Sequence, residues 1–133
     1  MNHAKKLLEH LKTGLFSHIL ISGTPEALDN LYLNLVKECR ANNISTFAIE
    51  FSNDDPSYCY QYENSDVLFV KGLEILPPKH HQAYSLRTML DAGKSKGLKS
   101  FIFCEQSAVK QHFDDYTAPF YRFCLRYPLS LLS

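Results

Sequence analysis

Residues 23 to 30 carry the first group of side chains that could handle a phosphorylated ligand. A phosphate-binding loop, G-x-x-x-x-G-K-[ST], needs glycines so that backbone N–H groups can wrap the phosphates, and a lysine against their charge. Counted from Gly23, the second glycine is Leu28, the lysine is Asp29 and the hydroxyl residue is Asn30. Reversing a charge about 4 Å from a phosphate turns an attraction of about 4 kcal/mol at an effective dielectric of 20 into a repulsion. We therefore expect no working phosphate loop here.

The same residues favour a plain helix start instead. Thr24 is a good N-cap, and Pro25 suits the first helical position and has no N–H to donate to a phosphate. The prediction is a capped helix that directly follows a strand.

The second group lies at residues 65 to 77. Its first half is a short apolar run closed by Gly72, typical of a central parallel strand that is covered on both faces. In nucleotide-hydrolysing α/β proteins such a strand delivers an acidic residue that holds magnesium through water. Here the strand ends in Lys71 and Gly72, so the scaffold is kept and the metal chemistry is lost. Glu74 or Glu105 would be the nearest substitutes for the missing acid.

The elements that must position these residues alternate along the chain. We expect helices at 3–13, 25–41, 79–92, 107–113 and 117–122, strands at 18–23, 46–51, 66–71, 100–104 and 123–129, a loop at 52–64 and a turn at 93–97. Strands alternating with helices predict crossover units, a parallel sheet and helices on both faces. With no repeat and no linker, residues 1–133 are interpreted as one three-layer α/β/α domain.

Composition excludes several function classes. The chain has 133 residues, 45% of them apolar, with 14 basic and 14 acidic residues, so no net field gathers nucleic acid or an anionic membrane. Its four cysteines are widely spaced and predicted to be reduced. Without a signal peptide or a long apolar segment, we expect a cytoplasmic protein.

With these segments laid out, the chain resembles the AAA+ core of bacterial enhancer-binding proteins, the activators of sigma-54 RNA polymerase. Residues 17–23 look like the strand that enters that family's G-E-x-G-x-G-K-E loop, and residues 66–77 are similar to its G-T-L-F-L-D-E-I-x-x-L-P stretch. Residues 100–106 resemble the sensor strand. Residues 120–123 with 127–129 look like L-Y-Y-R-L-N-V-F-P-I. The match covers roughly residues 15 to 131.

The resemblance implies a five-stranded sheet of the P-loop NTPase type in the order 5-1-4-3-2, ring assembly, and ATP-driven remodelling of polymerase. It places Gln106 at the sensor position and Arg122 at one trans-acting arginine position, whereas the other would fall at Tyr116. The Walker A lysine position is Asp29, with Gly23 and Thr24 in the same degenerate loop, and the Walker B acids are replaced by Lys71 and Gly72. The G-A-F-T-G-A loop, the helical lid and a DNA-binding helix-turn-helix are absent.

Other groups of residues are weaker candidates for a functional site. Adjacent His80 and His81 point about 100° apart on a helix and lack a further ligand, so no metal site is predicted. Cys104 with Glu105 and His112 could suggest a nucleophile with a base, but no oxyanion hole is readable. The alternating Tyr58, Tyr60 and Tyr62 fit a cover over the core or, alternatively, a patch that binds a partner. Lys94, Lys96 and Lys99 are interpreted as a solvated basic turn.

Two functions remain open at this stage. The first is a catalytically inactive AAA+-like module, a pseudo-ATPase without cofactor or metal. It would act in transcription regulation by binding a protein partner, either an AAA+ transcription activator or further copies of itself. The alternative is a weak nucleotide-binding protein related to the replication initiator DnaA, whose strand motif matches residues 66–76 nearly as well, and which would act in replication control.

Overall fold

The protein is built on a parallel sheet. The computed structural model describes residues 3–13, 17–51, 66–76, 80–94 and 97–129. Its helices are α1 (His3–Lys12), α2 (Pro25–Ala41), α3 (His81–Lys94) and α4 (Gln106–Val109), with the 3₁₀ turn η2 (Leu73–Ile75) and the π-helical turn η3 (Lys110–Asp114). Its strands are β1 (His18–Gly23), β2 (Thr46–Glu50), β3 (Val67–Lys71), β4 (Lys99–Glu105) and β5 (Leu125–Pro128).

The five described strands pair in the order β2-β3-β4-β1-β5, and all four pairings are parallel. The predicted α/β class and five-stranded parallel sheet are thus confirmed. Read from the β5 edge, the described strands run β5-β1-β4-β3-β2. Because parallel strands all end at the same edge of a sheet, this arrangement brings the C-terminal residues of β2, β3 and β4 side by side.

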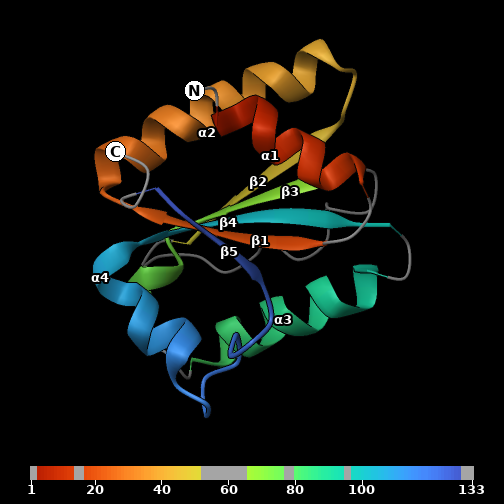
Figure 1. Ribbon diagram of the computed structural model, residues 1–133. Coiled ribbons are helices and arrows are strands. Elements are labelled where there is room, and N and C mark those ends of the chain that lie inside the picture. The colour runs from red at the N-terminus through yellow and green to blue at the C-terminus, as the bar shows by residue number, and fades with distance from the viewer. Residues whose placement is uncertain (1–2, 14–16, 52–65, 77–79, 95–96, 130–133) are drawn as a thin grey trace.

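Helices cover both faces of the sheet, as predicted (Figure 1). Alternate residues of each strand point to opposite faces, so every central strand contributes to two cores. On one face α1 and α2 pack over Ile19, Ile21, Phe69 and Phe101. On the other face, α3 packs over a second group of strand side chains. That second core contains Leu20, Leu68, Val70, Ile102 and Cys104.

Helix α2 shows why the local sequence predicts structure well here. Thr24 has extended backbone angles, and its Oγ1 accepts a hydrogen bond from the amide of Ala27 at 3.2 Å. Pro25 occupies the first helical position, and the helix ends at Asn42. On its apolar face Leu28, Leu31 and Leu35 are buried, whereas Val36 is only partly buried. Both β1 and α2 have the predicted bounds.

The helix expected at residues 117–122 was wrong, because these residues form turns. Asp115 explains part of the difference: its Oδ1 accepts hydrogen bonds from the amide and the hydroxyl of Thr117, at 2.9 and 2.8 Å. Such side-chain bonds compete with helical ones. Arg122 then takes a left-handed φ of 55°, which a helix does not contain.

Other predicted bounds shifted by a few residues. Helix α3 begins at His81 and includes Gly93 and Lys94, which the sequence had assigned to a turn. The helix expected at 107–113 is the short α4 followed by the π-helical η3. The 3₁₀ turn η2 was not predicted. The tyrosines at 58, 60 and 62, the loop at 52–64 and Lys96 lie outside the described residues. No helix in the described part of the chain is long and apolar enough to cross a bilayer.

Candidate functional site

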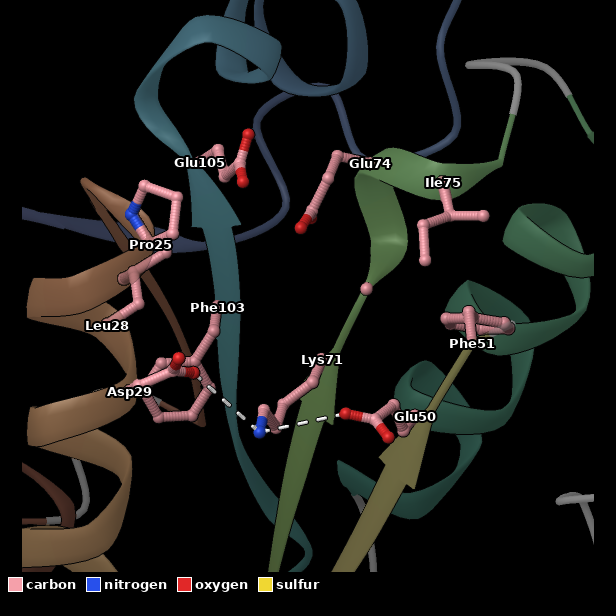
Figure 2. A pocket seen from close by; sticks show the side chains of 11 residues that line it. Pro25, Leu28, Asp29, Glu50, Phe51, Lys71, Glu74, Ile75, Phe103 and Glu105 are labelled. Atoms are coloured by element: carbon pink, nitrogen blue, oxygen red, sulfur yellow. Dashed lines mark ion pairs between the residues drawn. The ribbon is translucent and has the colours of Figure 1, made fainter. Parts of the chain in front are cut away.

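A pocket of about 400 Å³ opens where the strands end, between the start of α2 and the turn after β3 (Figure 2). This is the edge at which open parallel α/β sheets bind ligands. The pocket has both apolar and charged walls. It is lined by Pro25, Leu28, Asp29, Glu50, Phe51, Lys71, Gly72, Glu74, Ile75, Phe103 and Glu105.

Lys71 is the centre of one half of the pocket. Its Nζ lies 4.0 Å from Oδ1 of Asp29 and 3.7 Å from Oε2 of Glu50, so the last residue of β3 is paired with α2 and with β2. The ammonium also lies 4.3 Å from the centre of the Tyr32 ring, a cation–π contact. Asp29 and Tyr32 are three residues apart on α2 and therefore share the face that receives the lysine. Figure 2 shows the ammonium between the two carboxylates.

The charges at the two positions that the sequence analysis compared with nucleotide-binding motifs are therefore opposite to those motifs and paired with each other. An acid stands where the phosphate-loop motif would have its lysine, and a lysine stands where the resemblance would place the magnesium-binding acid. The two meet across the pocket at 4.0 Å. The sequence predicted each replacement separately, and the structure brings them into one ion pair.

The connection between β1 and α2 is too short to form a loop around phosphates. Only Thr24 separates the last strand residue, Gly23, from the first helical residue, Pro25. Two of the amides that follow are already used: that of Ala27 donates to the Thr24 hydroxyl, and that of Leu28 donates to the Thr24 carbonyl at 3.0 Å. Residues that the loop motif would need in an open conformation are helical here.

The residues that follow β5 cover Gly23. The amide of Leu129 bonds the Ser22 carbonyl at 2.8 Å. A Cβ placed on Gly23 would lie 3.2 Å from Cβ of Leu129, so the buried leucine packs directly on this glycine. Neither Gly23 nor Thr24 lines the pocket.

Gly72 cannot carry a larger residue without a backbone shift. Its φ is +78°, in the left-handed region, and a Cβ there would lie 2.8 Å from the carbonyl oxygen of Phe51. Real Cβ atoms do not approach this closely, and an L-residue also pays for the positive φ. The backbone at this position thus excludes the glutamate that the resembled family carries there.

The other half of the pocket holds Glu74 and Glu105. Glu74 lies on η2 and Glu105 ends β4, and their side chains project into the same opening (Figure 2). Among the described residues neither carboxylate is in a salt bridge with a lysine or arginine. Oε2 of Glu74 is buried, and it has no hydrogen-bond partner among the residues that the structure describes. Burial, opposed by the residue's own backbone amide and reinforced by Glu105, raises the pKa of Glu74 above its usual value of 4.5.

The remaining predicted site residues lie outside the pocket. Gln106, which the resemblance places at the sensor position, is exposed at the start of α4, while its neighbour Glu105 lines the cavity. Arg122 is exposed, and its guanidinium lies over the Tyr121 ring at 5.2 Å from the centroid. Since Arg122 precedes the parallel strand β5, it belongs to the opposite end of the sheet from the pocket. Tyr116 is 79% exposed.

Cys104, the possible nucleophile, is buried and its thiol is protonated. Burial, together with the negative charges of Glu74 and Glu105, raises the pKa of the Cys104 thiol to about 12. His112 is also buried, which lowers its pKa from 6.5. A thiol with this pKa carries almost no thiolate at neutral pH, so this trio is a poor nucleophile and base. Cys39 and Cys104 are free thiols, as predicted.

The sequence predicts no metal site at His80 and His81. His80 and His81 lie with ring centroids 4.2 Å apart, and the described residues contain no group of three or more side chains suited to a metal ion. In the described part of the chain, no histidine, cysteine or carboxylate set is therefore assembled for coordination.

Four pocket residues were missed by sequence reasoning: Glu50, Phe51, Ile75 and Phe103. Glu50 and Phe51 could have been found, because the predicted strand at 46–51 ends with them and the ends of parallel strands meet at one edge of the sheet. The place of Ile75 in the pocket depends on the turn η2, which has no clear sequence signal.

In comparisons with known proteins, no family model and no curated protein sequence matches the chain.

Proposed function

We propose that this chain is a catalytically inactive, AAA+-like module that acts in regulation through protein partners rather than through ATP hydrolysis. The observation that carries the proposal is the ion pair between Lys71 and Asp29. A phosphate site and a magnesium site would need these two charges the other way round.

Electrostatics argues against a bound triphosphate. Asp29 is 70% exposed, so its repulsion of a phosphate 4 Å away is nearer the aqueous figure of about 1 kcal/mol than the figure of about 4 kcal/mol for an effective dielectric of 20. To this is added the loss of a lysine contact and of the amide cradle. Lys71 would in turn repel the magnesium ion that accompanies ATP. Each of these contributions weakens the binding of ATP with its magnesium ion.

The strand order supports an AAA+-type core. The order β5-β1-β4-β3-β2 among the described strands agrees with the order that the resemblance to sigma-54 activators implies. An inactive relative of such activators would be retained for its surfaces. Its partner would then be an AAA+ transcription activator or another copy of the chain.

Calorimetric titration with ATP and ADP, with and without magnesium, tests the absence of nucleotide binding. We expect no saturable heat at millimolar nucleotide. Asp29→Asn is the informative variant, because removing the repelling charge should strengthen any residual binding. Micromolar affinity of the unaltered chain would overturn the proposal.

Affinity capture from the native host tests the partner. Transcription activators or the chain itself are the expected binding partners. Recovery of neither a transcription nor a replication component would count against an interaction role.

A second candidate is a weak nucleotide-binding protein of the DnaA-related type. The observation that favours it is that Glu74 and Glu105, the possible substitute acids, both line the pocket. It predicts slow ATP hydrolysis that Glu105→Gln abolishes and that exposed Asp91→Asn leaves unchanged.

A further inference from the structure

Strand β2 forms one edge of the sheet and pairs with β3 alone among the described strands. At one end of this pairing the Val67 amide donates to the Ser45 carbonyl at 3.1 Å, and at the other end the Phe51 amide donates to the last residue of β3 at 3.0 Å. The odd-numbered residues of β2 therefore bond β3. Because successive residues of a strand direct their backbone groups to opposite sides, the even-numbered residues direct theirs away from β3.

The outward backbone groups of β2 belong to Thr46, Ala48 and Glu50. Ala48 and Glu50 are exposed, and Thr46 is half-buried. Within the described part of the chain, no strand or turn forms a backbone hydrogen bond with these three residues on the outer side. A row of unpaired N–H and C=O groups at the edge of a sheet is a template on which another strand can pair.

The opposite edge of the sheet is protected against such pairing. Strand β5 has four residues, carries the exposed Arg126 and ends in Pro128, which has no N–H to donate. Short strands, basic side chains and prolines are the features that commonly keep an edge strand from pairing. Residues 46–50 of β2 include no proline and no basic residue. Of the two edges of the described sheet, β2 is therefore the one that is open to a further strand.

An exposed apolar side chain lies on the same side of the molecule. Leu33 on α2 is 62% exposed, and it follows Asp29 by four residues, so the two side chains share one side of the helix. Asp29 faces Lys71, whose ammonium also pairs with Glu50 of β2. Leu33 is therefore on the side of α2 that faces β2, where Ala48 is also exposed. A strand added at this edge would bring further protein surface toward this leucine.

The sequence of β2 is complementary to a second copy of itself. Antiparallel pairing about a two-fold axis at Ala48 places Ala48 opposite its own copy and Thr46 opposite Glu50. Each of these three residue pairs exchanges two hydrogen bonds, which gives about six in all. Glu50, the one charged residue of the strand, then faces a threonine, while Phe47 comes opposite Ile49 as an apolar cross-strand pair. With 14 basic and 14 acidic residues, the chain has no net charge to repel its copy.

We propose that two copies of this chain associate by antiparallel pairing of their β2 edges, which joins the two sheets into one across a two-fold axis. Self-complementary contacts of this kind are the commonest way in which identical chains assemble. The axis is perpendicular to the sheet, so α2 of both copies lies on the same face and the two Leu33 side chains flank the joined strands. The inference rests on the proposed function for its biological role, and it names the partner and the surface.

Sedimentation equilibrium of the full chain from micromolar to millimolar concentration tests the association. We expect a reversible dimer with twice the 15.3 kDa mass of the single chain. Amide hydrogen exchange on the same samples locates the contact. The amides of Thr46, Ala48 and Glu50 should exchange freely in the dilute monomer and become protected as the dimer forms.

Two variants of Ala48 separate the edge from the fold. Ala48→Pro removes an outward N–H from each copy and no bond to β3, so dimerisation should weaken at least about thirtyfold. Ala48→Lys places two ammonium groups opposite each other and should weaken the dimer most at low salt. Ala48→Val keeps the N–H and should keep the dimer, as should Thr88→Lys, an equal charge change at an exposed position of α3. Urea denaturation of each variant checks that it is folded.

Three results would overturn the inference. A chain that stays monomeric at millimolar concentration has no self-association, even if it captures another host protein through Ala48. A dimer that both folded Ala48→Pro and Ala48→Lys retain uses another surface. Protected amides at 46, 48 and 50 in a monomer would mean that the chain itself covers the edge. ATP titration is read separately: micromolar affinity would refute the proposed function, whereas a monomer that does not bind ATP would refute only the dimer.

Discussion

Replacing Lys71 by aspartate would place an acid of the kind that a magnesium site needs at the end of β3, and the structure predicts that this change destabilises the fold. Lys71 is 26% exposed at its side chain and is paired with Asp29 and Glu50, which are 70% and 69% exposed. An aspartate at this position would face two carboxylates instead of balancing them.

The expected loss in the free energy of unfolding follows in two steps, one for each substitution of Lys71. Lys71→Met removes two largely solvated ion pairs, worth a few tenths to 1 kcal/mol each, and a cation–π contact worth about 0.5–1 kcal/mol. We therefore expect a loss of about 1–2 kcal/mol. Lys71→Asp adds repulsion from two carboxylates, at about 1 kcal/mol for unit charges 4 Å apart in water. Its shorter side chain reduces this, so it should cost about 1–2 kcal/mol more than methionine.

The assay is urea denaturation of four chains: unaltered, Lys71→Met, Lys71→Asp, and Lys71→Asp combined with Asp29→Lys. The combined variant restores an opposite-charge pair and should recover at least 1 kcal/mol relative to Lys71→Asp alone, by the logic of a double-mutant cycle. Raising the salt concentration should shrink the difference between the aspartate and methionine variants. Lys37→Met, an exposed lysine on α2, is the control and should change little.

The reasoning is refuted if Lys71→Asp is as stable as Lys71→Met and if adding Asp29→Lys brings no recovery. Lys71 would then be solvated rather than engaged by its neighbours. The exchanged charges would have no structural consequence, and the main support for an inactive site would be lost.

Three further outcomes are expected. Gly72→Ala should lower the free energy of unfolding by about 2–3 kcal/mol, from the positive φ and the approach to the Phe51 carbonyl; thermal melting checks this, and a loss below about 0.5 kcal/mol would contradict the assigned backbone. Glu74→Gln should stabilise the chain at pH 7, because a carboxyl group whose pKa is raised in the folded state destabilises the fold once it is ionised. The stabilisation should vanish below pH 4.5, where the carboxyl group is protonated in both states. Urea denaturation midpoints at pH 4 and pH 7 test this, and a variant that is less stable than the unaltered chain at pH 7 would contradict it. His112 binds a proton more weakly in the folded state than in the unfolded state, so the free energy of unfolding should fall as the pH drops below 6.5. This fall should be smaller in His112→Gln when the stability of both chains is measured from pH 5 to 7.5. Parallel curves of stability against pH for the two chains would contradict a titrating His112.

Much of the fold could be predicted because its signals are local. The Thr24-Pro25 start of α2 satisfies the first amides within a few residues, whatever the rest of the chain does. The central strands are buried on both faces, so they appear as continuous apolar runs. The prediction of a helix at 117–122 was wrong because the Asp115 side chain accepts a hydrogen bond from the Thr117 amide and so stabilises a turn, which the spacing of apolar residues does not reveal.

Half of the candidate site was also visible in the sequence. Asp29, Lys71 and Gly72 were identified from their places in damaged motifs, and Glu74 and Glu105 as possible substitutes. Glu50, Phe51 and Phe103 were not, although they lie at or near the C-terminal ends of predicted strands. Ile75 could not be identified, because its place in the pocket depends on a 3₁₀ turn.

The sequence by itself determined which charges stand at the ends of its strands and helices, because side-chain identity and local capping are properties of the chain. Only the tertiary structure decided which of these charges meet. Lys71 pairs with Asp29 and Glu50, while Glu74 and Glu105 remain together without a cation in the described part of the chain. The reason is physical: these contacts join residues far apart in sequence, and the hydrogen-bonded order of the sheet, not any local preference, sets the distances between them.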